Sequence, residues 1–207
     1  MRELAIVSQF PDLSWRWQDD VPILKGIYHF NTEYRGIVFQ DSFNLEFIFP
    51  QNYPENIPLV KELDKKIPDK FHHLINGYLC LCTPLEQWLI FSKRPTLENY
   101  IKNLLNPYLL SWLWYDKYNE MPWGERCHGP MGLVQSYQEI LNIKDLDHTI
   151  LFMIKFLRNE IYQRQECPCG SGLPFRKCHK TIINRLANQL PQGQLRADFI
   201  SILRRMA

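Results

Sequence analysis

The chain has 207 residues, of which 45% are hydrophobic and 22% are charged, as in an ordinary globular protein. This length allows one domain of ordinary size and a small appendage. The formal net charge of +2 is too small to predict binding to nucleic acid, so we expect no nucleic-acid partner. No apolar run approaches the roughly 18 residues of a membrane span, and the N-terminus lacks a signal-peptide pattern. We therefore expect a cytoplasmic protein without a membrane partner.

In chain order, residues 1–20 predict a short helix or an irregular lead-in. Alternating apolar positions between residues 23 and 49 predict antiparallel strands, with a turn near Arg35 and Gly36. One face of the last strand should carry Phe43, Leu45, Phe47 and Phe49. The Pro-rich stretch 50–58 then ends the sheet.

A further short strand could follow at residues 59–63, and residues 68–95 read as a loop. Thr96 is the expected N-cap of a helix that reaches residue 118, and Pro107 should kink or split it. The apolar face of this helix should be made by Leu97, Tyr100, Ile101, Leu104 and Leu105.

The remainder of the chain reads as helical. Helices are expected from about Leu133, over residues 147–165, over 181–190 and over 196–207. The composition changes between residues 145 and 165, so we expect a domain of residues 1–145 and a helical extension of residues 146–207. Residues 151–207 contain ten Lys or Arg and three Asp or Glu. Such a basic part could meet an acidic partner, RNA or a membrane surface, or could be no more than a solvated helix face.

The most specific local pattern is CPCGSGLPFRKCHK, residues 167–180. Three thiols and an imidazole, from Cys167, Cys169, Cys178 and His179, are the donor set that zinc prefers in closed, structural sites. Glycines between the ligands allow the tight backbone turns that such a site needs. Binding of zinc would supply folding free energy to a segment too small to fold alone. These residues resemble the SEC-C motif, whose fixed positions all match; Leu173 and Pro174 depart from its usual lysine-rich middle.

A second cysteine pair occurs in FHHLINGYLCLC, residues 71–82. Three interpretations are open. Cys80 and Cys82 could bind a second zinc with Cys127 and His128, although they lack the glycine turns of a good metal site. They could be inert core residues, because cysteine behaves as a small hydrophobe when buried. Alternatively, Cys80 could be a thiol nucleophile.

The order of several segments favours the nucleophile. IFP is followed by YPENIPLV, then by GYLCL, and Trp88 lies eight residues after Cys80. This ordered set, within about residues 20–120, resembles the ubiquitin-conjugating (UBC-like) family. The resemblance implies an α+β fold with an antiparallel meander and flanking helices, followed here by the small zinc-binding helical extension. It also implies that Cys80 is the catalytic cysteine.

The resemblance implies the reaction and the partners as well. The chain would accept the C-terminal glycine tail of a protein as a thioester from an activating enzyme and transfer it to an amine on a protein target. The family's usual asparagine, eight residues before the cysteine, is replaced by His72, and His73 follows it. At least one of these histidines is expected to assist by hydrogen bonding or proton transfer.

Prokaryotic proteins of this kind resemble components of antiphage defence. The carried tail would be that of a ubiquitin-like protein or, in cyclic-oligonucleotide-based signalling (CBASS), that of a nucleotidyltransferase. Two other classes stay open. One is an inactive UBC-like adaptor that only recognises a ubiquitin-like partner. The other is an interaction protein in which the zinc motif is the functional part.

Overall fold

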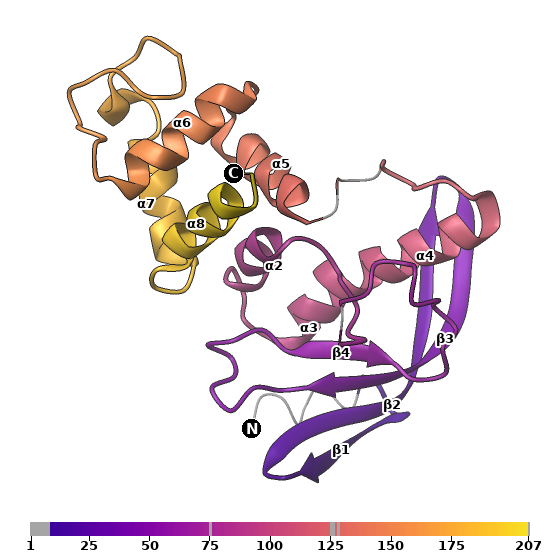
Figure 1. Ribbon diagram of the computed structural model, residues 1–207. Helices are drawn as coiled ribbons and strands as arrows, with labels where there is room; N and C mark the ends of the chain where they lie inside the picture. Colours follow the sequence, from indigo (N-terminus) through magenta and orange to yellow (C-terminus); the bar gives the residue numbers. More distant parts are fainter. Residues whose placement is uncertain (1–8, 75, 125–126, 128, 207) are drawn as a thin grey trace. The chain divides into compact units, whose positions relative to one another are not determined.

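The structure is a computed structural model that describes residues 9–74, 76–124, 127 and 129–206. The chain forms two compact units. The sheet unit comprises Met1–Cys82 and Lys93–Gly124, and the helical unit comprises Thr83–Ser92 and Glu125–Ala207. Strands β1 to β4 belong to the first unit and helices α5 to α8 to the second (Figure 1). The expected division into domains after residue 145 stays a prediction. In the structure, the chain leaves the sheet unit for the last time after Gly124.

The sheet unit contains a four-stranded antiparallel sheet whose strands are neighbours in chain order. The strands are β1 Leu13–Gln18, β2 Val21–Tyr34, β3 Ile37–Ile48 and β4 Leu59–Glu62. The expected antiparallel meander is therefore present, and the chain as a whole mixes this sheet with helices.

Strand β1 corrects the expectation of a helix or irregular lead-in at the N-terminus. It pairs with β2 through a two-residue turn at Asp19 and Asp20, which both have positive φ, 47° and 62°. Two positive-φ residues define the hairpin turn whose twist matches that of the strands, and Asp tolerates this conformation. The expected turn at Arg35 and Gly36 is confirmed and has the same character, with φ of 52° and 75°.

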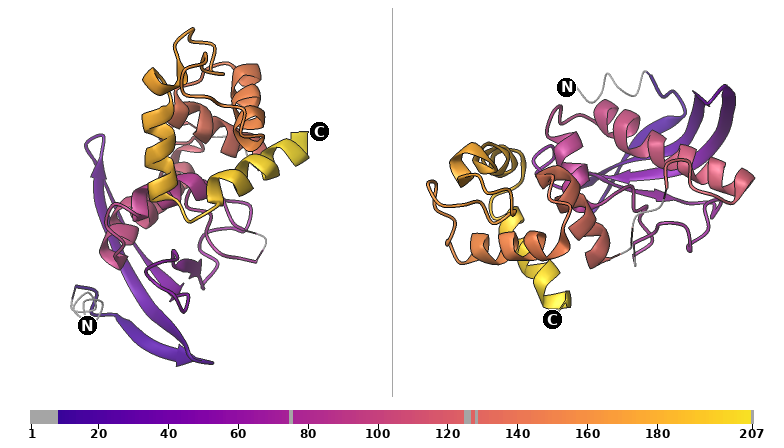
Figure 2. Two further views of the ribbon diagram at one scale, coloured as in Figure 1. Left: turned by 90° about the vertical axis from the view of Figure 1, so that its left-hand side faces the viewer. Right: turned by 90° about the horizontal axis from the view of Figure 1, so that it is seen from above.

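The predicted alternation in β3 is confirmed. Phe43, Leu45 and Phe47 are fully buried, as is Phe49 directly after the strand. A continuous helical segment covers this apolar face (Figure 2). It consists of α3 Leu97–Tyr100, the π-helical turn η1 Ile101–Leu105 and α4 Asn106–Tyr118. All five residues predicted for its apolar face are buried.

The helix does not end at Pro107. Thr96 is its N-cap, as expected, and its side chain accepts a hydrogen bond from the Asn99 amide. Before the proline, the Asn106 amide bonds to the Ile101 carbonyl, which is the wider spacing of a π turn. Proline has no amide hydrogen to donate, and the π turn lets the helix continue past it.

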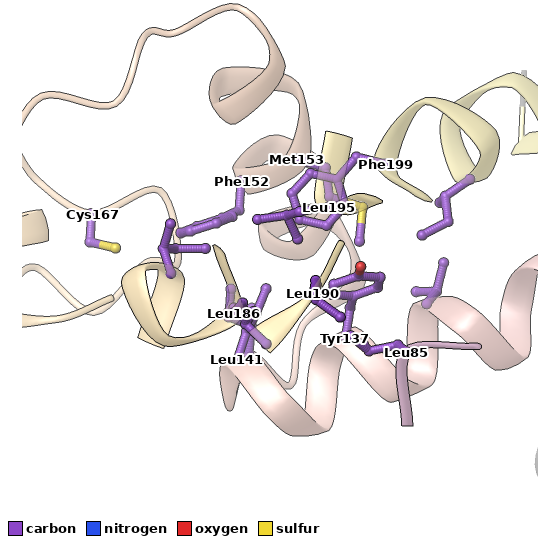
Figure 3. Packing of buried hydrophobic residues seen from close by; sticks show 14 of the residues in the cluster. Leu85, Tyr137, Leu141, Phe152, Met153, Cys167, Leu186, Leu190, Leu195 and Phe199 are labelled. Carbon is purple, nitrogen blue, oxygen red and sulfur yellow. The ribbon is translucent and has the colours of Figure 1, made fainter. Parts of the chain in front are cut away.

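The helical unit is built from five α-helices and one short 3-10 turn among its described residues. They are α2 Pro84–Phe91, α5 Pro130–Leu141, α6 Leu146–Leu157, η2 Phe175–Lys177, α7 Lys180–Gln189 and α8 Gln194–Met206. Their apolar faces share one core, with Leu85, Tyr137, Phe152, Leu186 and Phe199 among its fully buried members (Figure 3). No helix among the described residues has both the length and the apolar character of a membrane span.

Two boundaries in this unit differ from expectation. Residues 68–95 were expected to be a loop, yet they contain α2, whose N-cap Thr83 forms a reciprocal capping box with Glu86. The helix expected over residues 147–165 ends at Leu157. Asn159 has a φ of 57°, and a left-handed residue just beyond the last turn terminates a helix.

Candidate functional site

The first candidate site is the knuckle, residues 166–180. A bridge between Glu166 and Pro174 closes its loop, and the Cys167 amide donates to the Leu173 carbonyl at 2.8 Å. Gly170, with a φ of 78°, turns the chain back between the ligands. An added Cβ at this glycine would lie 2.5 Å from Nε2 of His148 in α6, so a second constraint also requires glycine there.

The four predicted ligands come together in this knuckle. Their ligand atoms all lie within 4.8 Å of one another. Nδ1 of His179 is 3.3 Å from Sγ of Cys167 and 3.0 Å from Sγ of Cys178, and the sulfurs of Cys169 and Cys178 are 3.5 Å apart. In a tetrahedral zinc site with Zn–S of about 2.3 Å, neighbouring ligand atoms are roughly 3.5–3.8 Å apart. The donor types and their spacing therefore fit a single zinc ion.

The imidazole of His179 is oriented by the helical core. Its Nε2 is 2.5 Å from the carbonyl oxygen of Leu141, the last residue of α5. Because a carbonyl only accepts, Nε2 carries the proton and Nδ1 is left as the ligand atom. Carbonyls at a helix end lack partners within the helix, so this bond also satisfies the end of α5. Sequence reasoning missed Leu141, since it contributes only a backbone atom.

The thiols of the knuckle have different environments. Burial raises the pKa of Cys167 to about 12. Burial also acts upward on Cys169, but hydrogen bonds from the side chain and backbone of Ser171 lower its pKa below the usual value. Oγ of Ser171 is close to the two half-buried sulfurs, 3.2 Å from Sγ of Cys169 and 3.3 Å from Sγ of Cys178. A bound cation would favour all three thiolates, because zinc binds the deprotonated sulfur.

Comparison with known protein families matches one of them. Residues 164–180 match the SEC-C motif, a zinc-binding type, and this range contains all four candidate ligands. The match covers a small part of the chain. No curated protein and no solved structure matched the chain.

The second candidate site is a short antiparallel hairpin, residues 72–80, in the sheet unit. A bridge joins His73 to Leu79, and the Cys80 amide donates to the His72 carbonyl at 2.7 Å. This pairing places His72 directly opposite Cys80 in the register. Leu79 is buried, whereas Cys80 is half-buried. The hairpin thus brings the backbone of one candidate histidine against that of the candidate nucleophile.

The two histidines have different roles in this hairpin. His73 is paired with the buried Leu79, and its Nδ1 is 2.8 Å from the carbonyl oxygen of Phe71. His72 has a φ of 42°, and its ring packs edge-on against Phe71 with 4.8 Å between centroids. His72 is therefore the better candidate to assist Cys80, because it is the one that shares the register position of the thiol.

Tyr108 of α4 holds the hairpin through a hydrogen bond to its backbone. The sequence did not indicate this role. Its hydroxyl donates to the carbonyl oxygen of Phe71 at 3.1 Å, and the carbonyl oxygen of His72, at 3.4 Å, is a second acceptor within range of the same proton. Burial raises the pKa of Tyr108 above its usual range, and the charge of a Cys80 thiolate adds to the effect. The only signal in the sequence is that a tyrosine on a buried helix face needs a partner for its hydroxyl.

Cys80 itself is not electrostatically activated. Burial raises the pKa of its thiol above the usual value for a cysteine. A thiol with a high pKa is mostly protonated at neutral pH, but its thiolate is intrinsically more nucleophilic. A reaction at Cys80 would therefore depend on positioning and on removal of the proton when the partner is bound.

The remaining candidates for a second zinc site belong to both units: Cys80 and Cys82 are in the sheet unit, and Cys127 is in the helical unit. Among the described residues, the knuckle is the only group of three or more potential metal ligands. Cys127 is exposed, and its sulfur accepts a hydrogen bond from the Gln135 amide at 3.4 Å. His128 lies outside the described residues. Trp88 belongs to α2 and packs against the core of the helical unit.

Proposed function

We propose that the chain is a ubiquitin-conjugating-type acyltransferase that carries the C-terminal glycine of a protein tail as a thioester on Cys80. The observation that carries the proposal is the hairpin 72–80, which follows a four-stranded meander and pairs Cys80 with His72. The sequence order of IFP, YPENIPLV and GYLCL supports the same conclusion. Fold alone does not imply activity, so the proposal depends on this site.

The proposed reaction has two balanced steps. The Cys80 thiolate attacks the thioester carbonyl on the activating enzyme, a new C–S bond forms, and the enzyme's own cysteine leaves as a thiolate. An amine of the target then attacks the Cys80 thioester, a C–N bond forms, and Cys80 leaves as a thiolate. The amine loses its proton to His72 or to solvent. Both steps depend mainly on proximity and orientation, since the first exchanges one thioester for another.

The knuckle has a structural role in this proposal. Cys167, Cys169, Cys178 and His179 would bind zinc, and their four donors leave no position for a substrate. Zinc supplies folding free energy there and takes no part in acyl transfer. The partners would be an activating enzyme, a ubiquitin-like protein or a nucleotidyltransferase tail, and a protein target, in an antiphage defence system such as bacterial ubiquitin-like conjugation or CBASS.

A thioester trap tests the proposal. The chain is mixed with ATP, an activating enzyme and the tail protein that this enzyme loads, then analysed by non-reducing gel and intact mass. We expect an adduct that thiol removes and that Cys80→Ala abolishes, while Cys82→Ala, the matched control two residues away, retains it. An adduct that requires Cys82, or no adduct with an activating enzyme shown to load the tail on itself, would contradict the proposal.

One observation favours a second function, an adaptor that binds a ubiquitin-like protein without chemistry. Burial raises the pKa of the Cys80 thiol, whereas an activated cysteine nucleophile has a lowered pKa. Cys80→Ser separates the two functions. The acyltransferase would form a stable ester with its tail on this serine, whereas an adaptor would bind its partner equally well with either residue and form no covalent adduct.

A further inference from the structure

Residues Thr83–Ser92 are a short excursion of the chain from the sheet unit into the helical unit. They belong to the helical unit, although the chain on both sides of them, up to Cys82 and from Lys93, belongs to the sheet unit. The segment that carries Cys80 therefore continues directly into α2 without a spacer. The amide of Cys80 is held in the sheet unit by the His72 carbonyl, whereas the residues directly after Cys80 lead into the start of α2.

The start of α2 is fixed by Thr83. Its hydroxyl caps the helix by accepting from the Glu86 amide at 3.4 Å and donates to the Glu86 carboxylate at 2.8 Å. The same hydroxyl is 2.9 Å from Oγ of Ser136 in α5. Ser136 is buried, and its one hydroxyl proton has two acceptors in range, Oγ1 of Thr83 and the Gly132 carbonyl oxygen at 3.1 Å. The cap of α2 is thus attached to the middle of α5.

The apolar side of α2 depends on the same neighbours. Leu85 is fully buried in the core of the helical unit, Trp88 and Leu89 pack against that core, and α2 packs against α5 and α7. Leu85 lies close to Tyr137 of α5 (Figure 3). A helix of eight residues is not stable by itself in water, so α2 requires this packing.

Both of these neighbouring helices depend on the knuckle. His179 immediately precedes α7, and its Nε2 donates to the carbonyl of Leu141 at the end of α5. One candidate metal ligand therefore joins the end of one supporting helix to the start of the other. Cys167 and His179 are 2% and 5% exposed, so without an ion two metal-binding side chains would remain buried beside each other.

We propose that α2 is a tether through which metal binding at the knuckle controls the order of the segment Cys80–Cys82. With zinc bound, α5 and α7 are fixed relative to each other and support α2, whose cap restrains the residues after Cys80. Without zinc, the knuckle loosens, α2 loses its support, and the Cys80 segment becomes more mobile. The consequence for acyl transfer rests on the proposed function, but the change in order does not.

Hydrogen exchange on the full chain tests the tether with zinc and after chelation. We expect amides in residues 84–91 to exchange at least about tenfold faster after chelation, while β3 is unchanged. Alkylation of Cys80 should become faster in parallel. Unchanged exchange in 84–91 while residues 166–180 lose protection would overturn the proposal. A purified chain that contains no metal and nevertheless protects 84–91 would overturn it as well.

A variant separates the tether from general unfolding. Ser136→Ala removes the bond to Thr83 without touching a metal ligand, and Ser201→Ala, at an exposed position on α8, is the matched control. Zinc content should be equal, and only Ser136→Ala should speed exchange in 84–87. If chelation also speeds hydrogen exchange in β3, the chain has unfolded more widely, and the comparison of the two variants is then the deciding test. Equal exchange in residues 84–87 of the two variants overturns the proposal. Neither readout needs an activating enzyme, so a chain that forms no thioester can still show the tether.

Discussion

A single hydroxyl, that of Tyr108, connects the helix that covers the sheet to the hairpin that carries Cys80. Its one proton has two successive backbone carbonyls in range, those of Phe71 and His72. The second carbonyl also accepts the amide of Cys80. The position of the thiol therefore depends on a side chain 28 positions later in the sequence.

We expect Tyr108→Phe to destabilise the sheet unit by about 1–2 kcal/mol, because the buried Phe71 carbonyl loses its hydroxyl donor. Chemical denaturation measures this loss. Loss of the hydroxyl should also change the pH profile of Cys80 alkylation, because burial of the thiol depends on the hairpin. Tyr118→Phe, at the exposed end of the same helix, is the control. Equal stability and equal pH profiles in the two variants would show that the hydroxyl does not organise the site.

At the scale of elements, the knuckle requires glycine for two different reasons, a positive φ and the lack of space for a side chain. Gly170 and Gly172 both have positive φ, 78° and 72°. An added Cβ would meet the His148 ring at the first position and nothing within 4 Å at the second. A substitution would therefore strain the backbone at both positions, whereas only a substitution at Gly170 would also clash with α6.

We expect Gly170→Ala to weaken zinc binding far more than Gly172→Ala. The control carries only the cost of a non-glycine residue at positive φ, on the order of 1 kcal/mol. Competition with a chromogenic chelator measures both affinities. Removing the opposing ring in Gly170→Ala/His148→Ala should restore affinity to the level of Gly172→Ala. If the double variant binds zinc no better than Gly170→Ala alone, the conflict with His148 is not the cause.

Elements with a strong local pattern could be predicted from the sequence. The alternation of β3 and the apolar spacing of α7 and α8 appear in the structure where expected. Strand β1 was missed because its turn uses Asp19 and Asp20 in a conformation more usual for glycine or asparagine. Helix α2 was missed because it is short and its formation depends on contacts with residues more than 40 positions away.

The candidate sites follow the same rule. The four knuckle ligands lie within thirteen residues of sequence, so their spacing alone predicts the cluster found in the structure. The partners that orient these residues are distant in sequence. Leu141 contributes a carbonyl that no side-chain pattern can indicate, and Tyr108 looks like any other buried aromatic residue of a helix.

At the scale of the whole molecule, the six cysteines divide between the two units. Cys80 and Cys82 belong to the sheet unit, and the other four belong to the helical unit. The only group of potential ligands among the described residues is in the helical unit. The two units are therefore expected to differ in their dependence on metal.

We expect one zinc ion per chain, measured by inductively coupled plasma mass spectrometry on purified protein. Cys167→Ala should abolish binding, because it removes a buried ligand from a closed site. Cys80→Ala/Cys82→Ala should leave the ratio at one. A ratio of two that falls to one in this double variant would instead establish a second metal site at the hairpin.

The helical unit is built from two separate stretches of the sequence, and this limits how the gene for such a protein can be rearranged. Its core needs Leu85, with Trp88 and Leu89 packed against it, and these residues are encoded within the stretch for the sheet unit. A fusion that copied only residues 125–207 onto another protein would leave that core without one of its helices. Exchange of the zinc-binding part between proteins would therefore have to transfer α2 as well, so the two units are expected to be inherited together.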